Sequence, residues 1–184
     1  ISRSTTEVMI DFPEPERPAT KEPYNILVAG VGGTGVVTIG ALLGMASHIE
    51  GKGCTVLDIT GLAQKGGAVL SHVRLADDPE QIHAVRVAAG EAHLILGCDL
   101  VVAAGKETLA KMRAGFTRAV VNDHETPTAG FTRNPDLVFP TSELEKIIGV
   151  ATGTGRSEFL DATTLATHLL GDSIASNLFM LGYA

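Results

Sequence analysis

A glycine cluster at residues 30–35 most constrains how this chain can fold. The apolar run that precedes it, residues 25–29, is too short for a typical helix and β-branched enough for a buried strand. From Gly35 to about His48, apolar side chains recur at mostly helical spacings, and Gly40 leaves one helix face with little bulk. A strand, a glycine loop and a helix in this order are typical of an α/β protein.

The glycines of this loop occupy the positions of a G-x-G-x-x-G motif. In such motifs the first glycine permits the turn, the second lets a phosphate approach, and the third packs the helix on the strand. The first amides of the helix should be unpaired and should attract an anion. The alternative is that the glycines serve packing alone. The candidate cofactor-binding residues of this loop are Gly30, Gly32, Gly33, Thr34 and Gly35.

A second glycine-bearing loop spans residues 61–67. Its lysine lies beside two glycines whose amides are open to approach, which suits an anion or carboxylate clamp. A solvated hairpin lysine is the plainer interpretation. The candidate binding residues of this loop are Gln64, Lys65, Gly66 and Gly67.

Several isolated polar residues invite both functional and structural interpretations. Asp58 is expected at the end of the second strand, where a Rossmann acid holds a ribose hydroxyl or a plain aspartate caps a turn. His72 and Arg74 share one face of a strand and suit a polar sheet face or a domain contact. Asn122 and His124 leave the carboxyl end of another strand, which makes them weak candidates for ligand contacts.

Strands and helices are expected to alternate along the chain. The predicted strands are residues 25–29, 54–58, 68–76, 82–87, 99–105, 118–122 and 136–139. The predicted helices are residues 35–48, 106–113, 142–148, 162–170 and 172–184. This alternation predicts an α/β fold with a Rossmann-like open sheet, mostly parallel, and helices on both faces.

Composition excludes several classes of function. With 184 residues, a net charge of −7 and no basic block, a nucleic acid or an anionic membrane is an unexpected partner. No apolar run reaches the roughly 18 residues that span a bilayer, and no secretory signal opens the chain, so we expect a cytoplasmic protein. Cys54 and Cys98 are interpreted as buried thiols without a metal site, and no catalytic nucleophile motif is present.

The two ends suggest a fragment of a longer polypeptide. Residues 1–23 are rich in proline and glutamate, as in an extended linker, and residues 24–184 form the expected domain. The chain starts without methionine and stops inside an apolar helical pattern, which suggests burial against another domain.

The two glycine motifs together resemble the gamma domain of 2-oxoacid:ferredoxin oxidoreductases. The resemblance rests on GVGGTGVVTIGALLG, a strand ending in Asp58, and GLAQKGGAVLSHVR, and it runs from about Tyr24 to Ala184. It is nearest to the indolepyruvate type, in which this domain is fused into one long chain. Lys65 stands where related pyruvate-type subunits usually have arginine, which keeps the charge but weakens bidentate binding.

The resemblance implies a module of a larger enzyme. That enzyme decarboxylates a 2-oxo acid on thiamine diphosphate, passes electrons through iron–sulfur clusters to ferredoxin and releases an acyl-CoA. Other domains or subunits hold the thiamine and the clusters, the parent is expected to be a homo-oligomer, and the gamma domain helps to accommodate coenzyme A. Two alternatives stay open: a self-sufficient NAD-type dinucleotide-binding module, and a non-catalytic interface domain.

Overall fold

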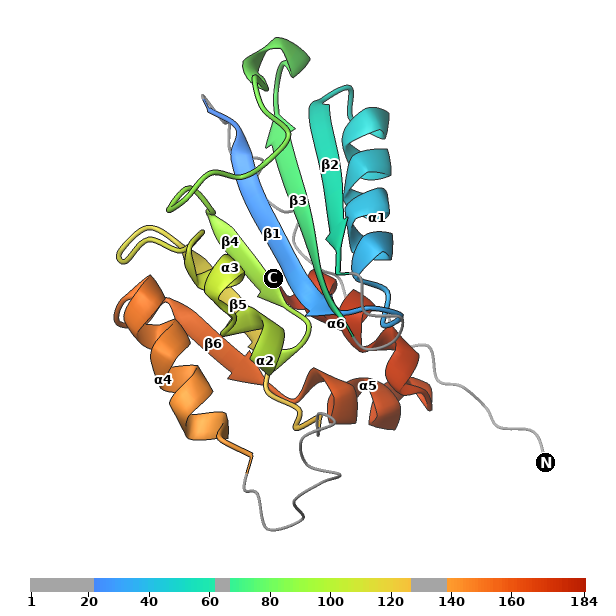
Figure 1. Ribbon diagram of the computed structural model, residues 1–184. Coiled ribbons are helices and arrows are strands. Elements are labelled where there is room, and N and C mark those ends of the chain that lie inside the picture. The colour runs from blue at the N-terminus through green and yellow to red at the C-terminus, as the bar shows by residue number, and fades with distance from the viewer. Residues whose placement is uncertain (1–21, 62–66, 127–138) are drawn as a thin grey trace, which may run out of the picture.

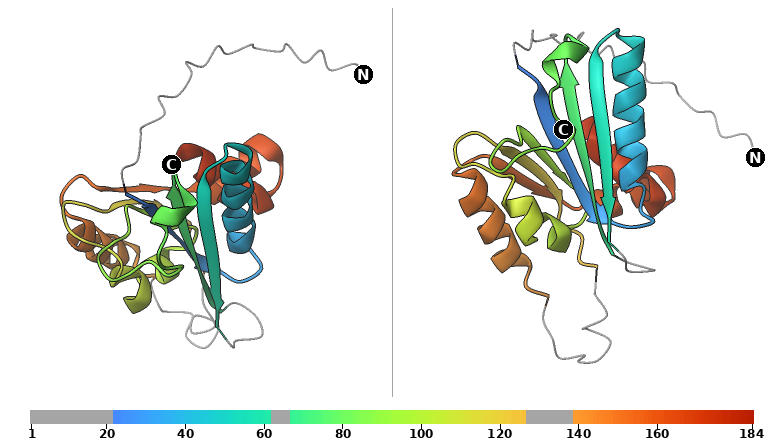
Figure 2. Two further views of the ribbon diagram at one scale, coloured as in Figure 1. Left: turned by 90° about the horizontal axis from the view of Figure 1, so that it is seen from above. Right: turned by 45° about the horizontal axis from the view of Figure 1, so that its top comes forward.

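The computed structural model describes residues 22–61, 67–126 and 139–184. Its centre is a six-stranded sheet in the order β2-β3-β1-β4-β5-β6, with helices on both faces (Figures 1 and 2). The strands are β1 (Tyr24–Val31), β2 (Gly53–Thr60), β3 (Ala68–Ala76), β4 (Leu94–Gly97), β5 (Arg118–Asn122) and β6 (Ser157–Leu160). β4, β5 and β6 continue the sheet in parallel from β1, whereas β3 runs antiparallel to both of its neighbours. The predicted mostly parallel α/β sheet is therefore confirmed.

Helices and short 3-10 turns connect the strands. They are α1 (Val36–Ile49), η1 (Pro79–Gln81), α2 (Leu100–Ala103), α3 (Lys106–Leu109), α4 (Thr141–Thr152), α5 (Ala162–Leu170), η2 (Ser173–Ala175) and α6 (Ser176–Tyr183). In the described part of the chain, none of these helices has the length and apolar character needed to cross a membrane.

The sheet separates two hydrophobic cores, because alternate side chains of a strand point to opposite faces. Leu27 and Ala29 of β1 pack on the side of α2 and α4, where Leu100 and Ile148 are buried. The intervening side chains of β1 pack on the other side, against α1, α5 and α6, where Met180 is fully buried. Both faces of β1 are therefore covered, which holds the loop after it in place.

Close contact between α1 and the sheet explains two of the glycines. A Cβ on Gly40 would lie 2.7 Å from the hydroxyl oxygen of Ser71, so the predicted close packing of this helix is confirmed. A Cβ on Gly30 would lie 2.7 Å from Cγ2 of Val36 and 3.0 Å from Cβ of Cys98. Gly30 still pairs within β1, so its expected role in the turn is wrong, and it serves helix packing instead.

Several element predictions are wrong for identifiable reasons. Residues 82–87 form no strand: they pack on the sheet without pairing with it, and the Val87 amide donates to the ring of His72 on the interior strand β3. Residues 99–105 are not a strand either: the strand is β4, and the Asp99 carboxylate caps α2 by accepting from the Val102 amide at 2.9 Å. β6 was not predicted, since four residues carry little periodicity. The strand predicted at 136–139 lies almost wholly outside the described residues.

Candidate cofactor-binding site

The loop between β1 and α1 depends on two glycines with positive φ. Gly33 has φ of 90° and Gly35, which precedes the first residue of α1, has φ of 99°. Both values lie in the region that other residues rarely adopt. The turn expected of Gly30 is therefore made by Gly33 and Gly35.

Backbone donors of this loop are left open. Among the described residues, the amides of Gly33, Gly35, Val36 and Val37 donate to no protein acceptor, whereas the Thr34 amide bonds back to the Val31 carbonyl oxygen at 3.3 Å. Such donors at the start of a long helix carry a partial positive charge. They suit an anionic group of a ligand.

The two glycine loops meet in the structure. The Gly32 amide donates to the Gly67 carbonyl oxygen at 2.9 Å, so the end of the second loop lies against the first. Of the other residues predicted for the second loop, Gln64, Lys65 and Gly66 lie outside the described residues.

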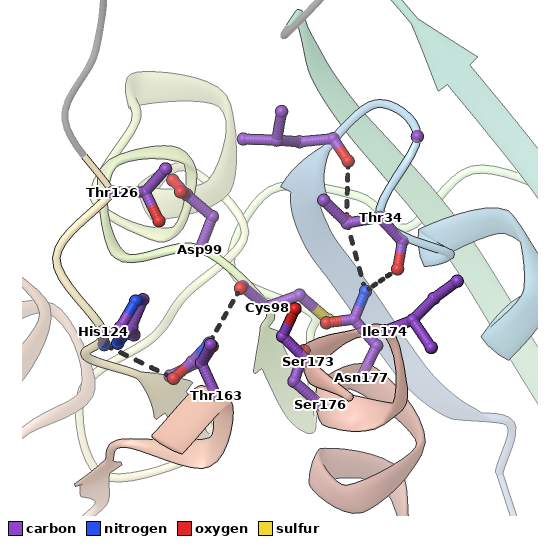
Figure 3. A pocket seen from close by; sticks show the side chains of 13 residues that line it. Thr34, Cys98, Asp99, His124, Thr126, Thr163, Ser173, Ile174, Ser176 and Asn177 are labelled. Atoms are coloured by element: carbon purple, nitrogen blue, oxygen red, sulfur yellow. Dashed lines mark hydrogen bonds between the residues drawn. The ribbon is translucent and has the colours of Figure 1, made fainter. Parts of the chain in front are cut away.

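A cavity of about 410 Å³ opens beside the first loop, at the carboxyl ends of β1, β4 and β5. Figure 3 shows Thr34 and Asn177 on one side of it and Asp99, His124 and Thr126 on the other. The lining mixes hydroxyl and amide side chains with apolar ones, and none of its described residues is Lys or Arg. Any anion held here therefore depends mainly on backbone amides. The carboxyl edge of a parallel sheet is also where open α/β folds bind ligands.

Asn177 of α6 contributes to the site and was missed by sequence reasoning. Its amide nitrogen donates to the Thr34 carbonyl oxygen at 2.7 Å and lies 3.2 Å from the Thr34 hydroxyl. The sequence offered one signal, a polar residue that interrupts the apolar C-terminal stretch. Nothing in that signal identified its partner.

Asn122 and His124 lie at the cavity, as predicted for the end of this strand. Asn122 is buried: its amide nitrogen donates to the Thr163 hydroxyl at 2.9 Å and its oxygen accepts from the Ala162 amide at 3.0 Å. It therefore braces β5 against the start of α5. His124 Nδ1 lies 3.1 Å from a carboxylate oxygen of Asp161, the residue that caps α5.

The carboxylates around His124 are perturbed in opposite directions. Desolvation, followed by the nearby Asp161 charge, raises the pKa of Asp123. For Asp161, partial burial raises the pKa, but hydrogen bonds from the Thr164 amide, the Thr164 hydroxyl and His124 outweigh it, so the pKa is lowered. Asp161 is therefore a stable anion that holds the His124 ring at the rim of the cavity.

The cysteines are unreactive in this environment. Burial, with a smaller contribution from the Asp99 charge, raises the pKa of Cys98 to about 12. Burial also raises the pKa of Cys54. Both are free thiols, but only Cys98 is buried as predicted, whereas Cys54 is half-buried. Both are held in the protonated form, which is a poor nucleophile and metal ligand. Within the described ranges, no group of three or more His, Cys, Asp or Glu side chains could hold a metal ion.

Asp58 does not reach the first glycine loop. β2 continues past it to Thr60, and β3 lies between β2 and β1, so Asp58 pairs with Ser71, which in turn pairs with Val28. Two strand spacings of about 4.8 Å therefore separate Asp58 from β1. The expectation that it ends the second strand is wrong, and the ribose-binding role loses its geometric basis.

His72 and Arg74 lie away from the cavity. His72 is fully buried and its Nδ1 accepts from the Val87 amide at 3.2 Å. Burial, and then the charges of Lys111 and Arg86, lowers the pKa of His72 to about 4. Arg74 donates to the Asn25 side-chain oxygen at 2.8 Å, near the amino end of β1. Both residues are structural.

An open, mostly parallel α/β sheet with a glycine loop and a cavity at its carboxyl edge defines a Rossmann-like α/β domain, the class of fold that places ligands at this edge. Residues 25–184 match the family model described as pyruvate ferredoxin/flavodoxin oxidoreductase, and the chain belongs to this family.

Two similar proteins have the same name, indolepyruvate oxidoreductase subunit IorB. The one from Methanothermobacter thermautotrophicus is 28% identical over 88% of this chain and 77% of its own length. The one from Thermococcus kodakarensis is 31% identical over 86% of this chain and 75% of its own length.

Solved structures share the fold. Subunit PORC of pyruvate oxidoreductase from Thermotoga maritima superposes with a TM-score of 0.58 at 16% identity, covering 87% of this chain and 74% of that one. A 2-oxoglutarate:ferredoxin oxidoreductase from Magnetococcus marinus, solved with 2-oxoglutarate, coenzyme A and succinyl-CoA bound, gives 0.61 at 16% identity. The match covers 86% of this chain and 23% of the Magnetococcus marinus chain, so the same fold occurs there as one part of a longer polypeptide.

Proposed function

We propose that residues 24–184 form the gamma-type domain of a 2-oxoacid:ferredoxin oxidoreductase that acts on indolepyruvate. Support comes from family membership and from relatives named as indolepyruvate oxidoreductase subunits. In the proposed reaction, indolepyruvate, coenzyme A and oxidised ferredoxin give indoleacetyl-CoA, carbon dioxide and reduced ferredoxin. Thiamine diphosphate, held by another domain or subunit, supplies the decarboxylation chemistry.

The role proposed for this chain is to hold part of coenzyme A. The observation that carries it is the set of unpaired amides at Gly33, Gly35, Val36 and Val37, the first of which belongs to a residue that lines the cavity of about 410 Å³. A phosphate group is the part of coenzyme A that these amides fit. The hydroxyl and amide groups of the cavity suit the polar, uncharged arm of the molecule. None of this chain's residues is assigned a catalytic role.

The second loop is proposed to complete this site. Gly67 is joined to Gly32 by a backbone hydrogen bond, so the described end of the second loop lies against the first loop. A lysine there would supply the cation that the described lining of the cavity lacks. Lys65→Ala should therefore raise the Michaelis constant for coenzyme A or lower turnover.

The assembly proposed for this domain includes the iron–sulfur domains or subunits of the parent enzyme, ferredoxin as electron acceptor, and a homo-oligomeric parent in the cytoplasm. The relatives' names describe subunits, which supports an assembly. Exposed apolar side chains on the last helices, Leu169, Ile174 and Leu178 among them, supply surface for such packing.

An anaerobic assay of the complete enzyme tests the proposal. Reduction of an artificial electron acceptor is measured with a panel of 2-oxo acids, each with and without coenzyme A. Fastest reduction with indolepyruvate, dependent on coenzyme A, is expected. A preparation that holds thiamine diphosphate and iron–sulfur clusters but reduces nothing with any 2-oxo acid would contradict the proposed function. Reduction that is independent of coenzyme A would leave this chain an interface domain.

A further inference from the structure

Asn177 connects the last helix to the glycine loop across most of the chain. The residue is 3% exposed, and its amide nitrogen donates to the Thr34 carbonyl oxygen at 2.7 Å. Because a carbonyl oxygen can only accept, the nitrogen and not the oxygen of the Asn177 amide must face Thr34. Figure 3 shows this orientation, with the Asn177 nitrogen turned to Thr34 and the oxygen turned away from it.

Thr34 is held from both sides. Its hydroxyl donates to the Val31 carbonyl oxygen at 2.7 Å and its amide donates to the same oxygen at 3.3 Å, which ties it to the end of β1. Asn177 holds it from the opposite side. Its two neighbours, Gly33 and Gly35, are glycines with positive φ and carry no side chain that could fix their position. Among the described residues, side-chain hydrogen bonds therefore hold the centre of this loop through Thr34.

The anchoring of α6 does not depend on this contact. Met180 is fully buried in the core on this face of the sheet. The Tyr183 hydroxyl donates to the Glu158 carboxylate at 3.0 Å, which ties the end of the helix to β6. A change at Asn177 should therefore free the loop and leave the helix in place.

We propose that Asn177 is a positioning residue for the binding of a phosphate-bearing cosubstrate. Through Thr34 it keeps the loop in the conformation that leaves the amides of Gly33 and Gly35 unpaired and that places Gly33 at the cavity. This inference rests on the proposed function of that loop. It adds that a residue of the last helix sets the affinity for coenzyme A without touching the reacting atoms.

The test compares variants in the complete enzyme. In Asn177→Ala, the Michaelis constant for coenzyme A should rise about tenfold, because one strong hydrogen bond that organises the loop is lost. Turnover at saturating coenzyme A and the Michaelis constant for the 2-oxo acid should stay within about a factor of two, because no reacting group is moved. A general structural defect would instead change all three constants together, and that result would overturn the proposal.

Asn177→Asp adds a pH profile. The carboxylate cannot donate to the Thr34 carbonyl and repels both that oxygen and a phosphate, so the Michaelis constant for coenzyme A should rise about thirtyfold near neutral pH. As the pH falls and the carboxyl takes up a proton, the donor returns and the repulsion ends, so the constant should fall below that of Asn177→Ala and towards that of the unchanged enzyme. If the Michaelis constant of Asn177→Asp for coenzyme A varies with pH in the same way as that of the unchanged enzyme, the proposal is contradicted.

Asn25→Ala is the matched control. Asn25 is also a buried asparagine, 4% exposed, whose amide bonds to a backbone oxygen, but it lies at the opposite end of β1. It should lower thermal stability and leave the Michaelis constant for coenzyme A unchanged. If Asn177→Ala fails to fold, Asn177→Ser is measured instead, and the same rise is expected because serine cannot span the gap to Thr34.

Gly33→Val separates failure of this inference from failure of the proposed function. If Gly33→Val raises the Michaelis constant for coenzyme A and Asn177→Ala does not, the loop binds the cosubstrate but Asn177 does not position it. If neither variant changes that constant, the loop is not the coenzyme A site and both proposals fall.

Discussion

The two ends of β1 differ in how their polar groups are used. At the amino end Asn25 is saturated: its amide nitrogen donates to Glu91, its oxygen accepts from Arg74, and its backbone amide donates to a ring nitrogen of His93 at 3.0 Å. Beyond the carboxyl end, the amides of Gly33 and of residues 35–37 have no acceptor among the described residues. One strand thus ends in a completed network at one side and in open donors at the other.

Ring contacts complete the network at the amino end. Tyr24 stacks on His93 with ring centroids 4.8 Å apart, His93 contacts Phe116, and the Arg113 guanidinium lies 3.8 Å from the Phe116 ring centroid. Burial, followed by the Arg113 charge, lowers the pKa of His93, so its neutral ring can accept the Asn25 amide. The side chain of Asn25 and the accepting ring nitrogen of His93 are therefore satisfied by partners among the described residues.

The comparison teaches how to tell stabilising polar groups from binding groups in one fold. The first amides of a helix have no partner within the helix, so at this largely exposed loop they stay open for water or for the acceptors of a ligand. The saturated end should therefore govern stability and the open end should govern binding. If the effects described below are not observed, the assignment of stability to one end of β1 and of binding to the other is wrong.

The largest expected effect separates two glycines of the same motif. Gly30→Val forces a side chain into Val36 and Cys98, and should lower the free energy of unfolding by about 3 kcal/mol. Gly33→Ala meets open space and bears only the cost of its positive φ, about 1 kcal/mol. Urea unfolding of both variants measures the difference. Equal losses would contradict the packing role given to Gly30.

The next effect concerns the middle of the sheet, where His72 pairs with Leu27. The pKa of His72 is about 4 in the folded chain, below its usual value of 6.5. Between these two pH values the unfolded chain is protonated at His72 and the folded chain is not, so acid favours unfolding. Stability should therefore be complete above about pH 6.5 and should fall by up to roughly 3 kcal/mol as the pH drops to about 4. His72→Gln should flatten this part of the profile, and an unchanged slope would show that His72 is not its source.

A smaller effect is expected from the saturated end. Asn25→Ala removes an amide that bonds to both Glu91 and Arg74, and should cost about 2 kcal/mol of unfolding free energy. Thermal unfolding gives the loss, and the coenzyme A titration of the complete enzyme should be unaffected. Weakened coenzyme A binding in this variant would blur the division between the two ends.

The smallest effect concerns the cap of α5. Asp161 accepts from the Thr164 amide at 2.8 Å, and Asp161→Ala should cost about 1 kcal/mol near neutral pH. Because the pKa of Asp161 is lowered by folding, this stability is present above about pH 4 and lost as the pH falls through the lowered value. Asp161→Asn, which keeps a cap without a charge, should lose that pH dependence. If the unfolding free energy of Asp161→Ala and of Asp161→Asn still falls in acid as it does in the unchanged protein, another carboxylate is the source of the pH dependence.

The sequence predicted the local features well because they depend on neighbours in the chain. The glycine loop, the strand at residues 68–76 and the thiol character of both cysteines follow from short-range patterns. Asp99 shows where local reasoning was incomplete: the apolar run after it suggested a strand, although an aspartate before such a run is also a helix cap.

Long-range pairings were beyond the same reasoning. The insertion of β3 between β1 and β2, which moves Asp58 away from the loop, depends on strand order and not on any local pattern. The bond from Asn177 to Thr34 joins residues 143 positions apart. Such contacts are set by how the whole chain packs, and one sequence alone does not reveal them.

Hydrogen–deuterium exchange of the complete enzyme, with and without coenzyme A, tests the difference between the two ends most directly. The account predicts slower exchange at residues 33–37 when coenzyme A is present, because the ligand supplies acceptors for the open amides, and no change around Asn25 and His93. Unchanged exchange at residues 33–37, in a preparation that turns over with coenzyme A, would contradict the assignment of this loop as its binding site.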